Sequence, residues 1–405
     1  MWHWLFLATG IFLCYLITLY AVPNFSKPGP EPLDHPPCKT HFGRNALIAV
    51  IAFFLFDAAV FHSGLYNLII APTSAAGTVV LQVEQESQRK PSQEKEILVL
   101  GDSRLYQGFS PKLADQLTFG KGFKFISVTL QASGPRLWFF LLREIDPSTR
   151  RYYAIVIPRV FDGLHALGNV ADKPRDIPMA APLLRYTDAY SFSSSFREQA
   201  DQYRAFIACL LRGSAFQLDF FDLLQHPAKR RKSAREHAAI MQARYEYVGK
   251  PDDVVGLSYD PARKRLSFPP DLPLPQRDAI EQSLLPLQQG RNQPQPRRDW
   301  TDKILRRYAN SPTLLISLPL PRGPLGPLAR PTGYSQTVAE ELMSKRRAVV
   351  LEDGLFNFIE APEFFFDGFH PNARGRQKIT ECLVNELLER LDSPAHTAAP
   401  AVSRP

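Results

Sequence analysis

Two short segments of the chain contain the residue types that nucleophilic catalysis by serine requires. The first is Gly101-Asp102-Ser103, and the second is Asp367-Gly368-Phe369-His370. A serine hydroxyl is a poor nucleophile until a base removes its proton, and histidine can do this near neutral pH. A carboxylate on the other ring nitrogen fixes the tautomer of the histidine and stabilises the imidazolium. Asp367 and His370, three residues apart, can supply this carboxylate and this base.

Each segment, taken alone, is also explained by an ordinary turn, because Gly-Asp-Ser is a common turn sequence. The surrounding pattern favours chemistry. The apolar run Ile97–Leu100 predicts a buried strand that ends at Gly101, so Ser103 lies where the chain turns toward a helix. Backbone N–H groups at such a turn can hold an oxyanion. His370 comes just before a predicted helix, Ala373–Leu391.

The elements that would position these segments alternate between strand and helix. Strands are predicted at Ile97–Leu100, Phe123–Leu130, Tyr152–Pro158, Thr313–Leu318 and Ala348–Leu351, and helices at Ser110–Leu117, Pro135–Ile145, Tyr334–Arg347 and Ala373–Leu391. Such alternation predicts an α/β domain, residues 97–391, whose parallel sheet has helices on both faces. Ligand sites in these sheets lie beyond the carboxyl ends of the strands.

A long segment, about 163–300, interrupts the alternation. Ser195–Leu224 and Ala234–Tyr247 are predicted to be helical, and the segment is either a subdomain inserted over the active face or partly disordered. It contains the basic run Lys229-Arg230-Arg231-Lys232. We expect no nucleic-acid partner, because no aromatic ladder accompanies this run. A solvated helix end explains it, or a contact with an anionic glycan or lipid headgroup. The tail, 392–405, is expected to be disordered.

The beginning of the chain predicts a membrane anchor, residues 1–71. The run Trp2–Val22 has no Lys, Arg, Asp or Glu, and at ~1.5 Å per residue it is long enough to cross a hydrocarbon core of roughly 30 Å. No Lys or Arg precedes it and Pro23 follows it, which favours a retained helix over a cleaved signal peptide. We expect a second transmembrane helix in Asn45–Ile70, although this run contains Asp57. A buried core helix is the alternative.

Basic residues predict how the two helices are oriented. Lys27, Lys39 and Arg44 lie in or beside the connector between the apolar runs, and no Lys or Arg precedes the first run. The positive-inside bias puts this connector in the cytoplasm, so both chain ends lie outside. A polar linker, 72–96, then leads to the α/β domain. In a bacterium, the domain would face the periplasm or the cell exterior from the inner membrane.

Cysteine usage limits the remaining classes of protein. Four cysteines in 405 residues exclude a scaffold built from disulfides, and the absence of a CxxC pair argues against structural zinc. Cys209 and Cys382 fall on predicted helices and are expected to be free and buried. We expect neither a metal nor an organic cofactor.

The order of the two segments on this strand pattern resembles the SGNH/GDSL hydrolase superfamily over roughly 96–391, apart from the insertion. The resemblance implies a three-layer α/β fold with Ser103 as nucleophile, His370 as base and Asp367 as the orienting acid. It also implies that Gly134, after the second strand, donates a backbone N–H to the oxyanion. The family's third block has an asparagine after strand three.

The chain departs from the family at this third block, because Arg159 and Asp162 stand there and no asparagine does. A looser resemblance is to membrane-anchored SGNH-like proteins that act with membrane-bound O-acyltransferases. These proteins have a Ser-Arg pair followed by a Gly-Phe/Ile-x-Pro turn, as in Ser103-Arg104 and Gly108-Phe109-Ser110-Pro111. Arg104 would bind a carboxylate or phosphate of the substrate, or form a salt bridge on its helix.

The function expected from this resemblance is a serine-type O-acyltransferase or esterase. Its substrate would be a glycan or polymer of the cell envelope outside the cytoplasm, and a membrane-bound O-acyltransferase would be its partner. Two alternatives stay open. One is a non-catalytic glycan-binding or assembly subunit that kept the fold, and the other is a lipase-like enzyme acting on phospholipid.

Overall fold

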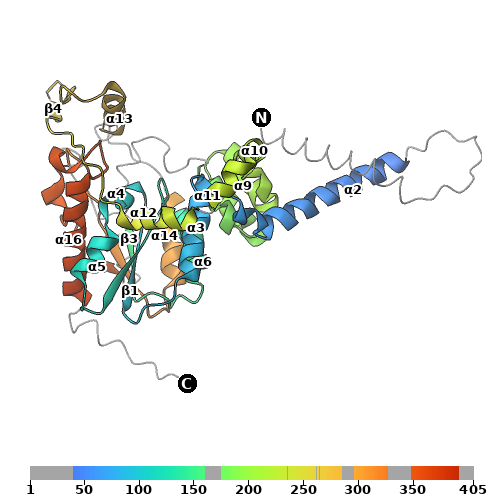
Figure 1. Ribbon diagram of the computed structural model, residues 1–405, viewed down its shortest axis with the longest axis horizontal. Helices are drawn as coiled ribbons and strands as arrows, with labels where there is room; N and C mark the ends of the chain where they lie inside the picture. The colour runs from blue at the N-terminus through green and yellow to red at the C-terminus, as the bar shows by residue number, and fades with distance from the viewer. Residues whose placement is uncertain are drawn as a thin grey trace, which may run out of the picture. The chain divides into compact units, whose positions relative to one another are not determined.

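The computed structural model describes residues 40–159, 175–234, 236–260, 262–263, 265–284, 296–326 and 348–391 (Figure 1). It divides into two compact units, Met1–Leu81 with Pro174–His237 and Gln82–Lys173 with Ala238–Pro405. Three predicted features lie outside the described residues: the first apolar run, Trp2–Val22; the helix Tyr334–Arg347; and the tail, 392–405.

The second unit contains a five-stranded sheet, so the α/β class is confirmed. Its strands are β1 (Lys95–Gly101), β2 (Phe123–Thr129), β3 (Ala154–Pro158), β6 (Leu314–Leu318) and β7 (Val349–Val350). All neighbouring strands are parallel, in the order β2-β1-β3-β6-β7. The chain turns from β1 toward β2 on one side and continues with β3 on the other. The sheet therefore has a switch point at β1 and β3, where ligands bind beyond the carboxyl ends of the strands.

Helices cover both faces of this sheet (Figure 1). On one face lie α4 (Ser103–Gly108), α5 (Pro111–Leu117) and α16 (Ala373–Leu391). Ile97 and Val99 of β1 share a buried core with Leu105 of α4 and Leu383 and Leu387 of α16. On the other face lie α6 (Pro135–Ile145) and α14 (Pro296–Arg307), which meet where the rings of Phe139 and Phe140 pack at a tilt against that of Trp300. The three-layer arrangement places α4, which begins with Ser103, against α16.

Local signals account for where these helices begin. The side chain of Ser110 accepts a hydrogen bond from the Leu113 N–H, and Pro111 is the first residue of α5. At the start of α16, the Asn372 side chain accepts a hydrogen bond of 3.0 Å from the Gly375 N–H. The helices predicted at Pro135–Ile145 and Ala373–Leu391 have these same bounds in the structure.

In the first unit, the second apolar run is not one continuous helix. It is divided among α2 (Thr40–Asp57), a π-helical turn, η2 (Ala58–His62), and a 3-10 turn, η3 (Leu65–Leu68). At the end of α2, the Asp57 carboxylate accepts hydrogen bonds from the N–H groups of Arg212 and Gly213, at 3.0 and 2.8 Å. Among the described helices, none combines the length and the apolar character needed to cross a membrane. The second transmembrane helix therefore stays a prediction.

The segment predicted as an insertion is shared by the two units. In the first unit it forms α7 (Asp176–Ala180), α8 (Ala189–Ser193), α9 (Gln199–Leu210), α10 (Gln217–Gln225) and α11 (Pro227–Ala234), with 3-10 turns η6 (Ala181–Leu183), η7 (Tyr186–Asp188) and η8 (Arg212–Ser214). In the second unit it forms most of α12 (His237–Glu246), a small hairpin of β4 (Ser258–Asp260) and β5 (Arg265–Ser267), and α13 (Leu274–Leu284). Its described part is thus ordered rather than structureless.

The range predicted as a linker, 72–96, contains a helix, α3 (Ala75–Gln88). Several of its side chains are buried.

Cys209 and Cys382 are both free, as predicted. Cys209 is buried, but Cys382 is only partly buried on α16.

Candidate active site

The serine of the first segment lies at the beginning of a helix, directly after strand β1. Gly101 ends the strand, Asp102 is the helix cap, and Ser103 is the first residue of α4. A β-carbon on Gly101 would lie only 2.5 Å from the β-carbon of Leu105, so a side chain cannot be accommodated there. Glycine therefore permits the tight strand-to-helix turn that brings Ser103 to the carboxyl end of the sheet.

The structure brings Ser103, His370 and Asp367 together in one hydrogen-bonded chain. The Nε2 atom of His370 lies 2.8 Å from the Oγ atom of Ser103, and its Nδ1 atom lies 2.7 Å from Oδ2 of Asp367. The other oxygen of Asp367 accepts hydrogen bonds from the N–H groups of Phe369 and His370, at 3.0 and 2.7 Å. The ring of His370 stacks on that of Phe366, with an angle of 9° between the planes. These contacts fix the imidazole in position on both sides.

The Asp367 carboxylate is held in its charged form. Burial by itself would raise its pKa, but the hydrogen bond to His370 and the two backbone N–H groups outweigh burial and lower this pKa below its usual value. An ionised Asp367 accepts the Nδ1–H of the imidazole, which leaves the Nε2 lone pair facing the serine hydroxyl. This is the tautomer that a general base requires.

The loop that presents His370 is fixed to the first turn of α16. The N–H of Asn372 donates to the carbonyl of Phe364 at 2.9 Å, and the Asn372 amide donates to the carbonyl of Glu363, also at 2.9 Å. Gly375 passes so close to this loop that a β-carbon on it would lie 2.3 Å from the Phe364 carbonyl oxygen. The glycine is therefore needed for the close approach of helix and loop.

Arg104 forms the salt bridge that was one of its two expected roles. Its Nε and Nη2 atoms lie 3.0 and 2.5 Å from Oδ2 of Asp102, and both side chains are buried. Burial tends to raise the pKa of Asp102, but the charge and hydrogen bonds of Arg104 lower it overall. Asp102 also accepts the N–H of Arg104 at 2.9 Å, which caps α4. The pair thus stabilises the helix that begins with Ser103.

Gly134 lies at the end of a loop that is tied to the first segment. The carbonyl of Gly101 accepts hydrogen bonds from the Leu130 N–H and the Ser133 hydroxyl, at 2.9 and 3.1 Å. Ala132 adopts a left-handed conformation, with φ of 57°, in this loop. No hydrogen bond among the described residues uses the N–H of Gly134, and a β-carbon there would meet no atom within 4 Å. The structure therefore gives this N–H no partner among the described residues.

The residue after strand β3 has a structural role. Arg159 is 1% exposed. Its Nη2 donates to the Leu351 carbonyl and lies 3.3 Å from the Asp353 carboxylate, and its N–H donates to the Leu318 carbonyl at 2.6 Å. These bonds join the ends of β3 and β6 to the chain that follows β7. Asp162, the other residue at this position, lies outside the described residues.

One residue that connects the segment of Ser103 to that of His370 was not predicted from the sequence. The Nη1 atom of Arg376, on α16, donates to the carbonyls of Tyr106 and Gln107 on α4, at 2.6 and 3.1 Å. Arg376 thereby ties α4, which begins with Ser103, to α16, which follows His370. An arginine in the first turn of an amphipathic helix is normally solvated, so the sequence carried no signal for its burial.

Comparisons of the chain with protein-family models and with curated proteins found no match. Across the described residues, no three His, Cys, Asp or Glu side chains lie close enough together to hold a metal ion.

Proposed function

We propose that this chain is a serine-nucleophile O-acyltransferase or esterase of the SGNH type. The observation that carries the proposal is the hydrogen-bonded chain from Ser103 through His370 to Asp367. A hydroxyl, an imidazole and an ionised carboxylate in this order are the groups that form and resolve an acyl-enzyme. Their position beyond the carboxyl end of β1 agrees with where parallel α/β sheets bind ligands.

The reaction would proceed in two steps. In the first step, Ser103 Oγ attacks the acyl carbonyl while His370 Nε2 takes its proton, and the Gly134 N–H donates to the oxyanion. The intermediate collapses when His370 returns the proton to the leaving oxygen, which leaves the acyl group on Ser103. In the second step, His370 deprotonates an acceptor hydroxyl or water, which attacks the acyl-enzyme and regenerates the free serine.

The proposed setting is the outer side of the bacterial inner membrane, with a glycan or polymer of the envelope as substrate. Two transmembrane helices, in Trp2–Val22 and Asn45–Ile70, would anchor the chain beside a membrane-bound O-acyltransferase that supplies the acyl group. Support for the second comes from α2, whose Leu47, Ile51 and Leu55 are largely exposed. Exposed apolar side chains along one helix are typical of surfaces that meet lipid or another protein.

The second candidate is a non-catalytic glycan-binding or assembly subunit. Arg159 favours it, because this buried arginine occupies the place where the SGNH family has an oxyanion-binding asparagine. Loss of one oxyanion donor typically slows acyl transfer by 10²–10³-fold without abolishing it. The intact triad therefore weighs more than the missing asparagine.

Turnover of a chromogenic ester, p-nitrophenyl acetate, separates the two candidates. The enzyme should release p-nitrophenol faster than buffer does, and Ser103→Ala should reduce release to the background rate. The matched control is Ser87→Ala, which removes an exposed hydroxyl that bonds only the Glu84 carbonyl. Equal release by the wild type and Ser103→Ala would favour the non-catalytic subunit.

A further inference from the structure

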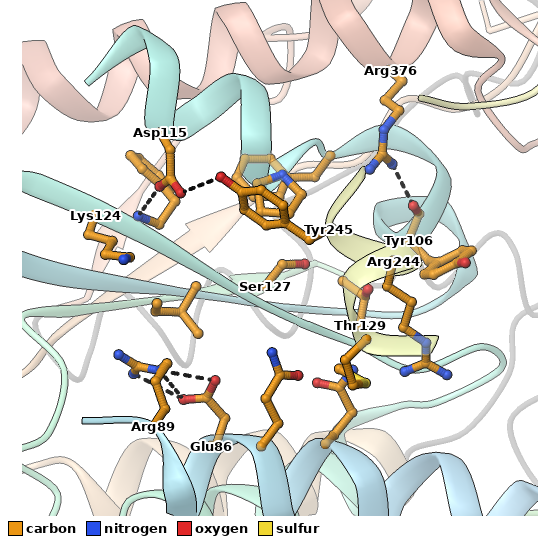
Figure 2. Close-up of a pocket in the computed structure, with 17 residues that line it drawn as sticks. Glu86, Arg89, Tyr106, Asp115, Lys124, Ser127, Thr129, Arg244, Tyr245 and Arg376 are labelled. Carbon is orange, nitrogen blue, oxygen red and sulfur yellow. Dashed lines mark hydrogen bonds and ion pairs between the residues drawn. The ribbon is translucent and has the colours of Figure 1, made fainter. Parts of the chain in front are cut away.

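A cavity of about 250 Å³ lies in the second unit, beside the helix that carries the nucleophile (Figure 2). Its walls come from the edge strand β2, from α4, α5 and α12, from the first turn of α16 and from the end of α3. Ser103 is not part of the lining. Tyr106, three residues further along α4, is. At ~1.5 Å of rise per residue, the cavity wall begins roughly one helical turn from the nucleophile.

Arg376 reaches this cavity from α16 and is 2% exposed. Its hydrogen bonds go to backbone carbonyls of α4, its Nε atom is buried without a partner, and its guanidinium lies 5.0 Å from the ring of Tyr247. No carboxylate of the described residues pairs with it. Burial lowers the pKa of this guanidinium to about 10, which reflects the cost of a buried charge that no anion compensates.

Arg244 reaches the same cavity from α12. Its Nη1 atom is buried and has no hydrogen-bond partner among the described residues. Figure 2 shows no interaction of Arg244 with the other residues of the lining. Burial lowers the pKa of Arg244 as well, and the interaction with Tyr106 offsets only part of this.

The two acidic side chains of the lining bond to partners other than Arg244 and Arg376 (Figure 2). Glu86 is bonded to Arg89 and accepts the hydroxyl of Tyr152 at 3.0 Å. Asp115 accepts the hydroxyl of Tyr245 at 3.0 Å. The pKa of Asp115 is raised, because burial outweighs the hydrogen bonds from Tyr245 and the Phe125 N–H and the charge of Lys124. The lining thus has two carboxylates and four cationic side chains, namely Arg89, Lys124, Arg244 and Arg376.

We propose that this cavity binds an anionic group of the substrate, a phosphate or a carboxylate, through Arg244 and Arg376. A guanidinium binds both groups with paired hydrogen bonds. The volume equals that of about eight waters in the liquid, enough for one such group with a short attachment. The assignment to a substrate rests on the proposed function. The substrate class that follows is an acidic or phosphorylated glycan or lipid-linked donor, held beside α4 while its ester or hydroxyl reaches Ser103.

Calorimetric titration of the full chain tests this site with three probes: inorganic phosphate, acetate and glucose 1-phosphate. We expect saturable binding of phosphate or acetate at constant ionic strength, and Arg244→Gln should weaken it by roughly tenfold or more, since a charge-assisted hydrogen bond is lost. The matched control is Arg374→Gln. The side chain of Arg374 is 67% exposed, and it lies as far as 3.9 Å from the Asp253 carboxylate. Its replacement should therefore leave binding of the probes unchanged.

The three probes distinguish the sources of the anion. Tighter binding of phosphate than of acetate assigns a phosphate, the reverse order assigns a carboxylate, and tighter binding of glucose 1-phosphate than of inorganic phosphate assigns a phosphorylated sugar. The proposal of an anion site is overturned if no probe binds saturably, or if Arg244→Gln and Arg374→Gln weaken binding equally.

A second variant separates this inference from the proposed function. Ser103→Ala should bind the probes as the wild type does, because Ser103 does not line the cavity. If Ser103→Ala binds normally while ester turnover proves absent in the wild type, the anion site stands and the catalytic proposal falls. If turnover depends on Ser103 but no probe binds, the reverse holds.

The second arginine is tested with Arg376→Lys, because Arg376→Gln would also remove bonds between α4 and α16. We expect Arg376→Lys to bind the probes more weakly than the wild type.

Discussion

At the scale of single residues, Ser103, His370 and Asp367 are expected to act as a unit. Ser103→Ala and His370→Ala should each lower ester turnover by at least about a thousandfold, and the double variant should be no slower than either single one. Asp367→Asn should keep measurable activity, because the imidazole survives in a poorer orientation. Steady-state rates on p-nitrophenyl acetate measure all four variants. Multiplicative losses in the double variant would show that the two residues act independently.

The lowered pKa of Asp367 predicts how stability depends on pH. Its pKa in the folded state lies below the ordinary value of 3.8, so ionised Asp367 stabilises the fold above about pH 4. This contribution is lost as pH falls toward the folded-state pKa. Urea denaturation between pH 6 and pH 3 should therefore show a larger loss of stability for the wild type than for Asp367→Asn. Parallel curves for the two proteins would contradict the shift.

The buried pair of Asp102 and Arg104 gives a second prediction at this scale. Arg104→Met should lower the free energy of unfolding by about 3–5 kcal/mol, because it leaves the buried Asp102 charge without its partner. Asp102→Asn combined with Arg104→Met should cost less than the sum of the two single changes. Urea denaturation of the three variants measures this coupling, and strictly additive losses would rule out the pair as a stabilising unit.

At the scale of elements, the close approach of α16 to the histidine loop can be tested. Gly375→Ala would put a β-carbon 2.3 Å from the Phe364 carbonyl oxygen, so the free energy of unfolding should fall by about 1–3 kcal/mol. Ester turnover should fall with it, because the loop carries His370. Gly134→Ala is the matched control, since its β-carbon meets no atom within 4 Å and its φ of −155° suits any residue. Its unfolding free energy should stay within about 0.5 kcal/mol of the wild type. Equal losses in the two variants would contradict this packing argument.

Most elements of the second unit could be predicted, because their signals are local. Buried parallel strands such as Ile97–Leu100 are continuous apolar runs, and Ser110-Pro111 marks a helix start through its own side chains. The proximity of Ser103, Asp367 and His370 could also be predicted, since Ser103 follows a strand and His370 precedes a helix. Residues defined by distant contacts could not. Burial of Arg159 depends on the chain that follows β7, and burial of Arg376 depends on α4 and on Tyr247.

Apolar character alone does not give the helix bounds of the first unit. The run Asn45–Ile70 is predicted as one transmembrane helix, which stays a prediction, and the structure divides it among α2, η2 and η3. Asp57, the last residue of α2, accepts hydrogen bonds from the N–H groups of Arg212 and Gly213, far along the chain. The range 72–96, predicted as a polar linker, contains α3, several of whose apolar residues are buried. Such distant contacts leave no signal in the local sequence pattern.

At the scale of the whole molecule, the proposed location is tested by topology. A reporter that is active only outside the cytoplasm should be active when fused after Leu81 and silent when fused after Lys39. The reason is that the positive-inside bias keeps the connector with Lys27 and Lys39 in the cytoplasm. Reporter activity normalised to fusion-protein level is the measurement. A silent fusion after Leu81 would mean that the second run does not cross the membrane, and the location would be wrong.

The central claim is that Ser103 is a nucleophile activated by His370, and covalent labelling tests it most directly. A fluorophosphonate probe should label the full chain on a single peptide, and mass spectrometry should place the adduct on Ser103. Ser103→Ala should be unlabelled and His370→Ala should label far more slowly, whereas the control Ser87→Ala should label at the wild-type rate. Two results would contradict this claim: a folded wild-type protein that takes no label, or a Ser103→Ala variant that is labelled as well as the wild type.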